Sequence, residues 1–415
     1  MELKRVVVTG FGAITPIGNN ANEYWENLVK GVSGAAPITL FDSTNFKTKF
    51  ACEVKNFNPL DHFEKKEAKK MDRNTQLGVV AAREAVAHSR IIEDNVDKNR
   101  VGVIWGSGIG GLETFETEVL GWANSNNIPR FNPFFIPKMI ADITPGQISM
   151  EYGFHGPNYA TVSACASSAN ALIDAKMLIQ LGKAEVIVSG GSEAAVTASG
   201  MGGFNALMAL STRNDDYKTA SRPFDKDRDG FVLGEGAGCI VLEEYEHAVK
   251  RGATIYAELS GGGLSADAYH MTAPHPEGLG AYLVMKNCLE DAGVTADEVD
   301  HINMHGTSTP LGDIAESNAI AKLLGEHAYD IQINSTKSMT GHLLGAAGVI
   351  EAIAAIGTMI HGVVPPTINH FTDDENIDSR LNFTFNHAVK KDVNIAMSNT
   401  FGFGGHNACV LFKKL

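Results

Sequence analysis

Cysteine is scarce and scattered in this sequence. The 415 residues include only Cys52, Cys165, Cys239, Cys288 and Cys409. Their number is odd, their spacing is wide and no Cys-X-X-Cys pair occurs, so we expect neither a zinc site nor a disulfide framework. Each cysteine is by default a small buried hydrophobic residue, and a functional role needs a further signal.

Long apolar runs and excess positive charge are also missing. No apolar run approaches ~18 residues, the length of a membrane-spanning helix, and residues 1–10 lack the apolar stretch and cleavage site of a secretory signal. The 34 lysines and arginines face 48 aspartates and glutamates, a net charge of −14, which disfavours generic nucleic-acid binding. We therefore expect a cytoplasmic protein with no nucleic-acid partner, no membrane partner and no metal.

Short β-branched runs alternate with helical stretches and predict an α/β fold. With 44% hydrophobic residues, the chain can bury a large core. The strands are expected at residues 5–9, 101–105, 159–163, 185–189, 239–242, 255–259, 301–304, 332–335, 395–398 and 409–412.

Two parts of the chain share one plan. In each, a strand runs through small polar residues, Ser163-Ala164-Cys165 in the first and 335–338 in the second, into an apolar helix. The second helix is expected to run to about Gly362. This pattern suggests an internal duplication joined near Gly252, with one half at 1–252 and the other at 253–415. No low-complexity linker separates them, so we expect tight packing.

One cysteine carries a further signal. Cys165 lies where a predicted strand ends and a helix begins, among small residues that leave room for a substrate. Unpaired N–H groups and the positive end of the helix dipole would favour its thiolate, which is the nucleophilic form. The alternative is a core cysteine packed under the helix.

Two histidine motifs follow strands in the second half. His305 starts a loop rich in glycine and hydroxyl groups, a usual place for functional residues, although a capped turn would explain the hydroxyls as well. His342 lies five residues after Lys337 among small and apolar neighbours. A buried lysine needs a partner, and Glu351, placed on the same predicted helix, is the candidate. The alternative is a surface lysine and a core histidine.

A loop with interleaved glycine and phenylalanine, 401–405, follows the strand at 395–398. Such a loop suits a gate over an apolar pocket or a backbone N–H donor to an oxyanion. An ordinary glycine-rich turn is the alternative.

Two further motifs resemble a dinucleotide-binding loop and a calcium-binding loop, but each lacks a feature that the ligand requires. Residues 106–111 match Gly-X-Gly-X-X-Gly, yet acidic side chains follow where a pyrophosphate would lie. Residues 225–230 open like a calcium loop, but Gly236 stands where the closing glutamate belongs. We interpret the second segment as a structural ion-pair loop.

Taken together, these segments resemble the β-ketoacyl-acyl-carrier-protein synthases, and among them the type II synthases of the dissociated bacterial pathway. The resemblance runs from residues 5–10 to 411–414 and includes 70–73, 134–137 and 221–238. It implies a thiolase-like fold, with two duplicated α/β halves in an α-β-α-β-α layered arrangement, and a homodimer. It also implies elongation of fatty acids by decarboxylative condensation of malonyl-carrier protein with a cysteine-bound acyl chain.

The resemblance assigns roles residue by residue. Cys165 would carry the acyl group, the backbone N–H groups of Cys165 and Phe401 would form an oxyanion hole, and His305 and His342 would donate hydrogen bonds to the developing enolate. Lys337, supported by Glu351, would order the site electrostatically. The substrate-binding residues would be Thr307, Thr309 and Thr272 for the phosphopantetheine arm and gate, and Ile109, Phe204 and Gly402 with Phe401 around the acyl pocket.

No cofactor would be held by the enzyme itself, because the acyl carrier protein delivers the phosphopantetheine arm. The carrier protein is acidic, so a local basic patch should dock it. The candidates are Lys65, Lys66, Lys69, Lys70, Arg130 and Arg213, although a solvated helix face explains a lysine run equally well.

The chain departs from the family at Ser167-Ser168, where many relatives have Thr-Gly, at His406, where some have threonine, and at Met208, where some have arginine. Four other functions compete. A thiolase would need a second reactive cysteine, and Cys409 lies in an apolar strand. A coenzyme-A-primed initiating synthase is the other rival in chemistry, and the two histidines with Lys337 favour decarboxylative condensation on a carrier protein. A non-catalytic chain-length partner would lack Cys165. A dinucleotide-dependent oxidoreductase would rest on residues 106–111 alone.

Overall fold

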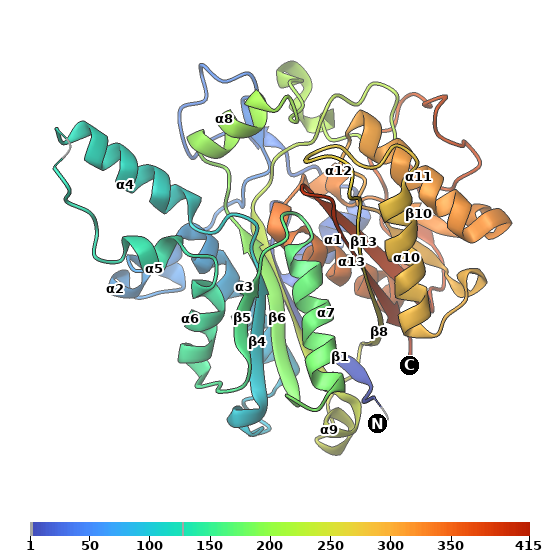
Figure 1. The fold of residues 1–415 in the computed structure, drawn as a ribbon, viewed down its shortest axis with the longest axis horizontal. Helices are drawn as coiled ribbons and strands as arrows, with labels where there is room; N and C mark the ends of the chain where they lie inside the picture. The colour runs from blue at the N-terminus through green and yellow to red at the C-terminus, as the bar shows by residue number, and fades with distance from the viewer. Residues whose placement is uncertain (1–2, 127) are drawn as a thin grey trace.

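One ten-stranded sheet runs through the molecule in a computed structural model that describes residues 3–126 and 128–415 (Figure 1). Every strand expected from the sequence is confirmed, and most are longer than expected. Across the sheet the order is β10 (Gln332–Asn334), β9 (His301–Asn303), β13 (Ile395–Gly402), β14 (His406–Lys413), β8 (Ala257–Ala266), β1 (Val6–Ile14), β7 (Gly236–Glu244), β6 (Val186–Glu193), β4 (Val101–Gly106) and β5 (Asn158–Thr161).

The strand order repeats about the centre of the sheet. Five strands on one side come from residues 1–252 and five on the other come from 253–415. Counted outward from the central β1–β8 pair, both sets follow the same order: first, fifth, fourth, second and third along the chain. This repeat supports the proposed division into two related halves, which stays a prediction.

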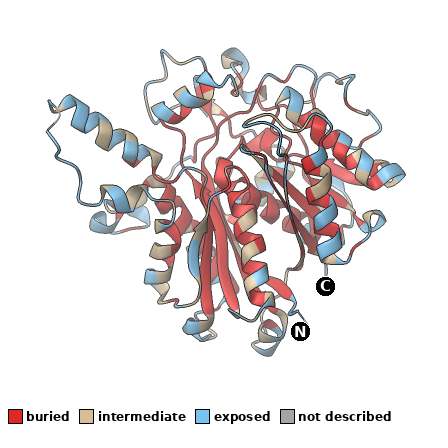
Figure 2. Cartoon of the chain, viewed as in Figure 1, coloured by how far each residue is buried: buried red, intermediate tan, exposed pale blue. Residues whose placement is uncertain are grey.

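Helices cover both faces of the sheet and also lie between its two halves, as the layered fold predicts. The inner helices α7 (Ser167–Gln180) and α13 (Ala347–His361) pack against each other and against both halves. Alternate strand residues face different layers, as in a sheet buried on both faces: Ile104 faces the inner core and Trp105 the outer. Figure 2 shows the central strands β4, β6 and β7 buried along their length. The outer helices are α3 (Arg73–Ser89), α6 (Ile143–Tyr152), α10 (Leu279–Ala292) and α11 (Pro310–Leu324).

The second strand-to-helix connection differs from the prediction. Instead of one helix to Gly362, the chain forms α12 (Lys337–Thr340), a turn, a short 3-10 helix (Leu344–Ala346) and then α13. The left-handed backbone of Gly341 (φ 68°) and Leu344 (φ 47°) breaks the helix. This turn holds His342.

The remaining helices are α1 (Ala21–Lys30), α2 (Lys65–Ala68), α4 (Leu112–Asn124), α5 (Phe135–Met139), α8 (Ala198–Ala206) and α9 (Tyr245–Lys250), and the two-residue strands are β2 (Ala36–Pro37), β3 (Phe50–Ala51), β11 (Val363–Val364) and β12 (Val389–Lys390).

One helical stretch corrects the expectation about apolar runs. Residues Leu344–His361 have a mean hydropathy of 1.6 over 18 residues, which is apolar enough for a membrane span by length and composition. Of this stretch, 89% is buried inside the protein. It is therefore part of the inner layer, and its high hydropathy reflects burial on all sides.

The segment at 225–230 is an ion-pair loop, as the sequence predicts. The guanidinium of Arg228 lies 2.7 Å from Asp374 and 3.4 Å from Asp313, and its side chain is 2% exposed. Asp225 accepts hydrogen bonds from the backbone N–H groups of Phe371 and Thr372. The loop thus fixes the start of α11 beside the residues that follow His305.

Candidate active site

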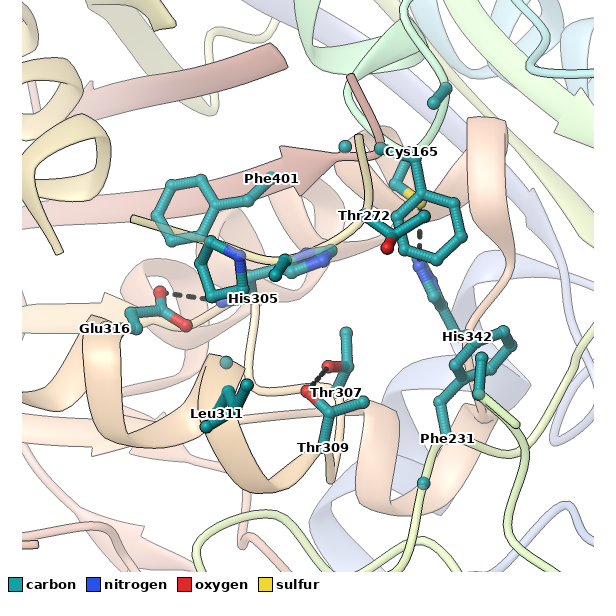
Figure 3. Close-up of a pocket in the computed structure, with 18 of the residues that line it drawn as sticks. Cys165, Phe231, Thr272, His305, Thr307, Thr309, Leu311, Glu316, His342 and Phe401 are labelled. Carbon is teal, nitrogen blue, oxygen red and sulfur yellow. Dashed lines mark hydrogen bonds between the residues drawn. The ribbon is translucent and has the colours of Figure 1, made fainter. Parts of the chain in front are cut away.

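A cavity of about 650 Å³ opens where the two halves meet, and Cys165 lies in its wall (Figure 3). Ten residues singled out from the sequence line it, drawn from both halves: Cys165, His305, His342, Phe401, Thr307, Thr309, Thr272, Ile109, Phe204 and Gly402. Lys337 and Glu351 lie behind the wall, and none of the six basic residues chosen for docking lines the cavity.

The nucleophile candidate sits in a strained turn between β5 and α7. Ala164, just before it, adopts a left-handed backbone (φ 50°), which is uncommon for a residue with a side chain. Ser167 braces the turn, because its hydroxyl donates to the Ala164 carbonyl (2.6 Å) and accepts from the Ser163 N–H (3.0 Å). The turn thereby presents the Cys165 sulfur to the cavity.

The thiol in this resting site is not activated in the way the sequence suggested. Burial raises the pKa of Cys165 to about 12, and the charge of Glu193 adds to the rise. The charge of Lys337 and the N–H groups of Phe403 and Cys165 pull the pKa down but do not offset burial. The position of Cys165 at a helix N-terminus therefore does not by itself lower the pKa of the thiol, because burial removes the thiolate from water.

His342 faces the sulfur directly. Its Nε2 lies 3.0 Å from the Cys165 Sγ, and Figure 3 shows this contact across the cavity wall. The backbone N–H of Leu344 donates to His342 Nδ1 (3.3 Å), so a neutral ring carries its proton on Nε2. His342 is thus a hydrogen-bond donor toward the reacting atoms.

His305 stands beside it, with ring centroids 5.2 Å apart. Its own backbone N–H donates to Glu316 Oε1 and that of Gly306 to Glu316 Oε2, both at 2.9 Å. Glu316 is buried and also accepts from Asn399 (3.1 Å). Because these contacts fix only the backbone, the imidazole stays free to face a ligand, and its buried Nδ1 has no partner among the described residues.

Both imidazoles are held neutral. Burial lowers the pKa of His305 and of His342 well below the usual range, and the positive charge of Lys337 lowers both further. The Lys337 ammonium is buried and pairs with Glu351, as the sequence predicts. Burial raises the pKa of Glu351 to about 7. The pairing fixes the Lys337 ammonium behind the histidines, outside the cavity.

The glycine-rich loop lies against the nucleophile. Its Phe403 N–H, like that of Cys165 itself, acts to lower the pKa of the Cys165 thiol, so Phe403 is a candidate for the second oxyanion donor beside Phe401. The two candidates are two residues apart in a repeated Phe-Gly pattern, so the sequence offered no way to choose. Gly402 approaches the nucleophile closely: an added Cβ would lie 2.7 Å from the Ser163 carbonyl and 3.1 Å from the Cys165 nitrogen.

The remaining cavity residues divide into polar and apolar groups. The hydroxyls of Thr307 and Thr309 lie 2.9 Å apart, on the floor that Figure 3 shows opposite Thr272. Phe204 and Phe231 form an edge-to-face pair with centroids 5.4 Å apart. Within the described ranges, no group of three or more His, Cys, Asp or Glu side chains is arranged to hold a metal ion.

The three departures from the family pattern are accommodated differently. Neither Ser167 nor Ser168 lines the cavity, and the Ser168 hydroxyl accepts from the Val349 N–H of α13 (3.0 Å), so it joins the two inner helices. Met208 lines the cavity and is 82% exposed. His406 is exposed, with its ring against Gly404 of the glycine-rich loop.

The basic residues chosen for docking lie on the surface. Lys65, Lys66 and Lys69 are exposed on and just after α2, while Lys70 pairs with Glu67. Arg130 is exposed, and Arg213 donates to the Asp227 carbonyl (2.9 Å).

Comparison with known proteins identifies similar chains over the full length. The family model described as the N-terminal domain of β-ketoacyl synthase matches residues 3–248, and the C-terminal domain model matches 256–371. A 3-oxoacyl-[acyl-carrier-protein] synthase 2 of Staphylococcus aureus (strain N315) is 49% identical, covering 99% of this chain and 98% of its own. That of Synechocystis sp. is 46% identical, covering 100% and 99%. A similar solved structure is a ketosynthase bound to a hexaketide, in complex with its type II PKS acyl-carrier protein. It is 32% identical with a TM-score of 0.92, and the match covers 100% of this chain and 100% of that chain.

Neutral imidazoles should persist at a pH where ordinary histidines are charged. An ordinary histidine side chain takes up a proton as the pH falls through about 6.5. Because the pKa of both rings is lowered well below that value, His305 and His342 should stay neutral there. Nitrogen-15 NMR of histidine-labelled protein, with the two rings assigned by their loss in His305→Asn and His342→Asn, would check this. A cavity histidine that titrates with a midpoint near 6.5 would contradict it.

Proposed function

The chain belongs to the β-ketoacyl synthase family, and on that premise we propose that it joins the two-carbon unit of malonyl-carrier protein to an acyl chain held on Cys165. The overall activity is that of a 3-oxoacyl-[acyl-carrier-protein] synthase, an acyltransferase that elongates fatty acids by two carbons. The observation that carries the assignment of roles is the 3.0 Å contact between His342 Nε2 and the Cys165 sulfur, with the second neutral imidazole beside it.

In the first half-reaction, the Cys165 sulfur attacks the thioester carbonyl of an acyl-carrier protein. The new Cys–acyl thioester forms, the bond to the carrier sulfur breaks, and the cysteine proton ends on the carrier thiol. The oxyanion that develops would be stabilised by the N–H groups of Cys165 and Phe403, both of which act to lower the pKa of the thiol. Covalent capture divides a hard condensation into two easier steps.

In the second half-reaction, malonyl-carrier protein loses carbon dioxide and leaves an enolate. Its negative charge gathers on the thioester oxygen, where His305 and His342 would each donate a hydrogen bond. Neutral donors suit this task, because no charge must first be desolvated. The enolate carbon attacks the Cys165 thioester, the carbon–sulfur bond breaks, and the 3-oxoacyl chain leaves on the carrier while the cysteine thiolate takes up a proton.

The competing functions lack a specific observation in their favour. A thiolase needs a second cysteine in the cavity, and Cys409 is fully buried within β14, away from it. A non-catalytic partner would not need a cysteine facing a histidine at hydrogen-bond distance.

Acylation of the nucleophile tests this function. Incubation with an acyl-carrier protein should add one acyl group to the wild-type protein and none to Cys165→Ala. Malonyl-carrier protein should then discharge the acyl group and yield a 3-oxoacyl-carrier product. Intact-protein mass spectrometry follows both steps.

Cys409→Ala is the matched control for this experiment and should acylate like the wild type. A wild-type protein that never acylates would sink the proposal. One that acylates but is never discharged by malonyl-carrier protein would remove the roles given to His305 and His342.

The phosphopantetheine arm would enter the cavity along the hydroxyls of Thr307 and Thr309, which lie close enough to bind one amide group together. Thr272 would face the arm from the neighbouring loop, whose Met271 carbonyl accepts the Gly404 N–H (2.7 Å). Ile109 and Phe204 would contact the acyl chain. We propose that the enzyme holds no cofactor of its own, and that it works in the cytoplasm.

The acidic carrier protein would dock on basic surface residues: Lys65, Lys66, Lys69 and Lys70 on and just after α2, with Arg130 and Arg213. Their support is exposure and charge: a local positive patch lets a chain of net charge −14 attract an acidic partner.

Charge reversal at this patch should weaken docking selectively. Lys65→Glu with Lys69→Glu should raise the KM for acyl-carrier protein by about three- to tenfold with kcat nearly unchanged, since rim charges act on encounter. Lys250→Glu, an exposed change on α9, is the control and should leave KM unchanged. Equal effects from both variants, or no effect at the patch, would contradict the docking site.

A second copy of the chain would cover the exposed side of the first half. Strand β5 is an unpaired edge of the sheet, and such edges invite pairing with another chain. The projecting helices α4 and α5 (Figure 1) expose large apolar side chains, which on a soluble surface mark an interface. These are Phe115, Leu120, Trp122, Phe131, Phe134 and Ile136.

The homodimer has a direct test. Sedimentation velocity should give twice the 44.3 kDa mass of one chain. The double substitution Trp122→Glu with Phe131→Glu places charge among the exposed apolar side chains of α4 and the segment between α4 and α5, and it should shift the protein to monomer. The control Val249→Glu, equally apolar and exposed on α9, should leave the mass unchanged. A monomeric wild-type protein would overturn the assignment.

A further inference from the structure

A buried carboxylate in the cavity wall has no place in the reaction described above. Glu193 ends strand β6, is fully buried and lines the cavity. Its Oε2 accepts the backbone N–H of Gly108 (2.8 Å) and of Gly345 (3.0 Å). Its Oε1 accepts the N–H of Ile109 (3.1 Å) and the hydroxyl of Ser107 (3.3 Å). One side chain therefore holds two segments that are far apart in the sequence.

The two segments serve different parts of the cavity. Residues 107–109 follow β4 and carry Ile109 into the wall. Gly345 follows Leu344, which also lines the wall and whose N–H fixes the Nδ1 of His342. The carboxylate thus connects a wall of the first half to the turn of the second half that orients the imidazole.

The packing around the Glu193 carboxylate leaves no space for an added side-chain atom at Gly108 or Gly345. A Cβ added to Gly108 would lie 2.7 Å from Glu193 Oε2. One added to Gly345 would lie 2.7 Å from the same oxygen and 2.3 Å from the Gly108 nitrogen. The absence of side chains at these two glycines lets the segments meet on one oxygen, so a displacement of either segment is transmitted to the other.

We propose that Glu193 is a positioning residue that couples the acyl-chain wall at Ile109 to the turn of His342. The inference rests on the proposed function, because it takes Ile109 as a contact of the acyl chain. A carboxylate is needed because all four partners donate. A glutamine of the same shape would turn an N–H₂ group toward donors and leave buried N–H groups unpaired. Burial raises the pKa of Glu193 to about 6, while its donors act in the opposite direction.

The test measures coupling and not only activity. In single-turnover acylation of Cys165 by short-chain and long-chain acyl-carrier proteins, Ile109→Ala should change the ratio of the two rates. Glu193→Gln should change this ratio by about fivefold or more, and the double variant should change it no further than the larger single change. Decarboxylation of malonyl-carrier protein, which depends on His342, should also fall about tenfold in Glu193→Gln.

Two controls separate positioning from stability and from failure of the function itself. Glu243→Gln alters a buried carboxylate paired with Arg251, away from the cavity; it should lower the melting temperature and leave the ratio unchanged. If Glu193→Gln does not fold, Ser107→Ala removes one donor and should shift the ratio by about twofold in the same direction. Wild-type loading and discharge are measured first, so their absence would count against the proposed function. An unchanged ratio in Glu193→Gln, or effects that multiply in the double variant, would overturn the coupling.

Discussion

The buried ammonium group of Lys337 is the charge on which the arrangement of the cavity depends. It lies behind the wall, fixed by Glu351, and acts on Cys165, His305 and His342 through space. The field of one cation favours a thiolate over a thiol and a neutral imidazole over a charged one. A single lysine therefore biases the nucleophile and both donors in the direction that condensation needs. Its burial prevents water from screening the effect.

The positions of the strands and most of the residues that line the cavity could be predicted from the sequence. The central strands β4, β6 and β7 are buried along their whole length, so local pattern and tertiary environment agree there. Cys165 and His305 stand just after strand ends among small residues, and parallel topology gathers such positions at one edge. The pairing of Lys337 with Glu351 followed from the cost of burying an unpaired cation.

Other features depend on contacts that no local pattern reveals. The thiol pKa is governed by burial from several elements, so a helix N-terminus could not decide it. The choice between Phe401 and Phe403 depends on how the loop returns to Cys165. The helix expected from 335 to 362 is broken by the positive φ of Gly341 and Leu344. A single glycine inside a helical pattern is a weak signal, and leucine has no turn preference. Glu193 and Glu316 were missed because their partners are mainly backbone N–H groups, which have no signature in the sequence. For Glu193 the available signal was an acidic residue at the end of a buried strand, and Glu316, within α11, had no such signal.

The strand order has a consequence for how such an enzyme tolerates change. The nucleophile belongs to residues 1–252 and both imidazoles belong to 253–415, and the Val7–Glu258 and Val8–Ala257 pairs join the two sets of strands at the centre of the sheet. The packing of the inner helices α7 and α13, together with the backbone pairing of Val232 and Gly234 with His342, therefore aligns sulfur and ring. Misplacement by about one ångström can cost about a hundredfold in rate. Substitutions on those helices, remote from any substrate, would thus be filtered by selection as strictly as changes to the reacting groups.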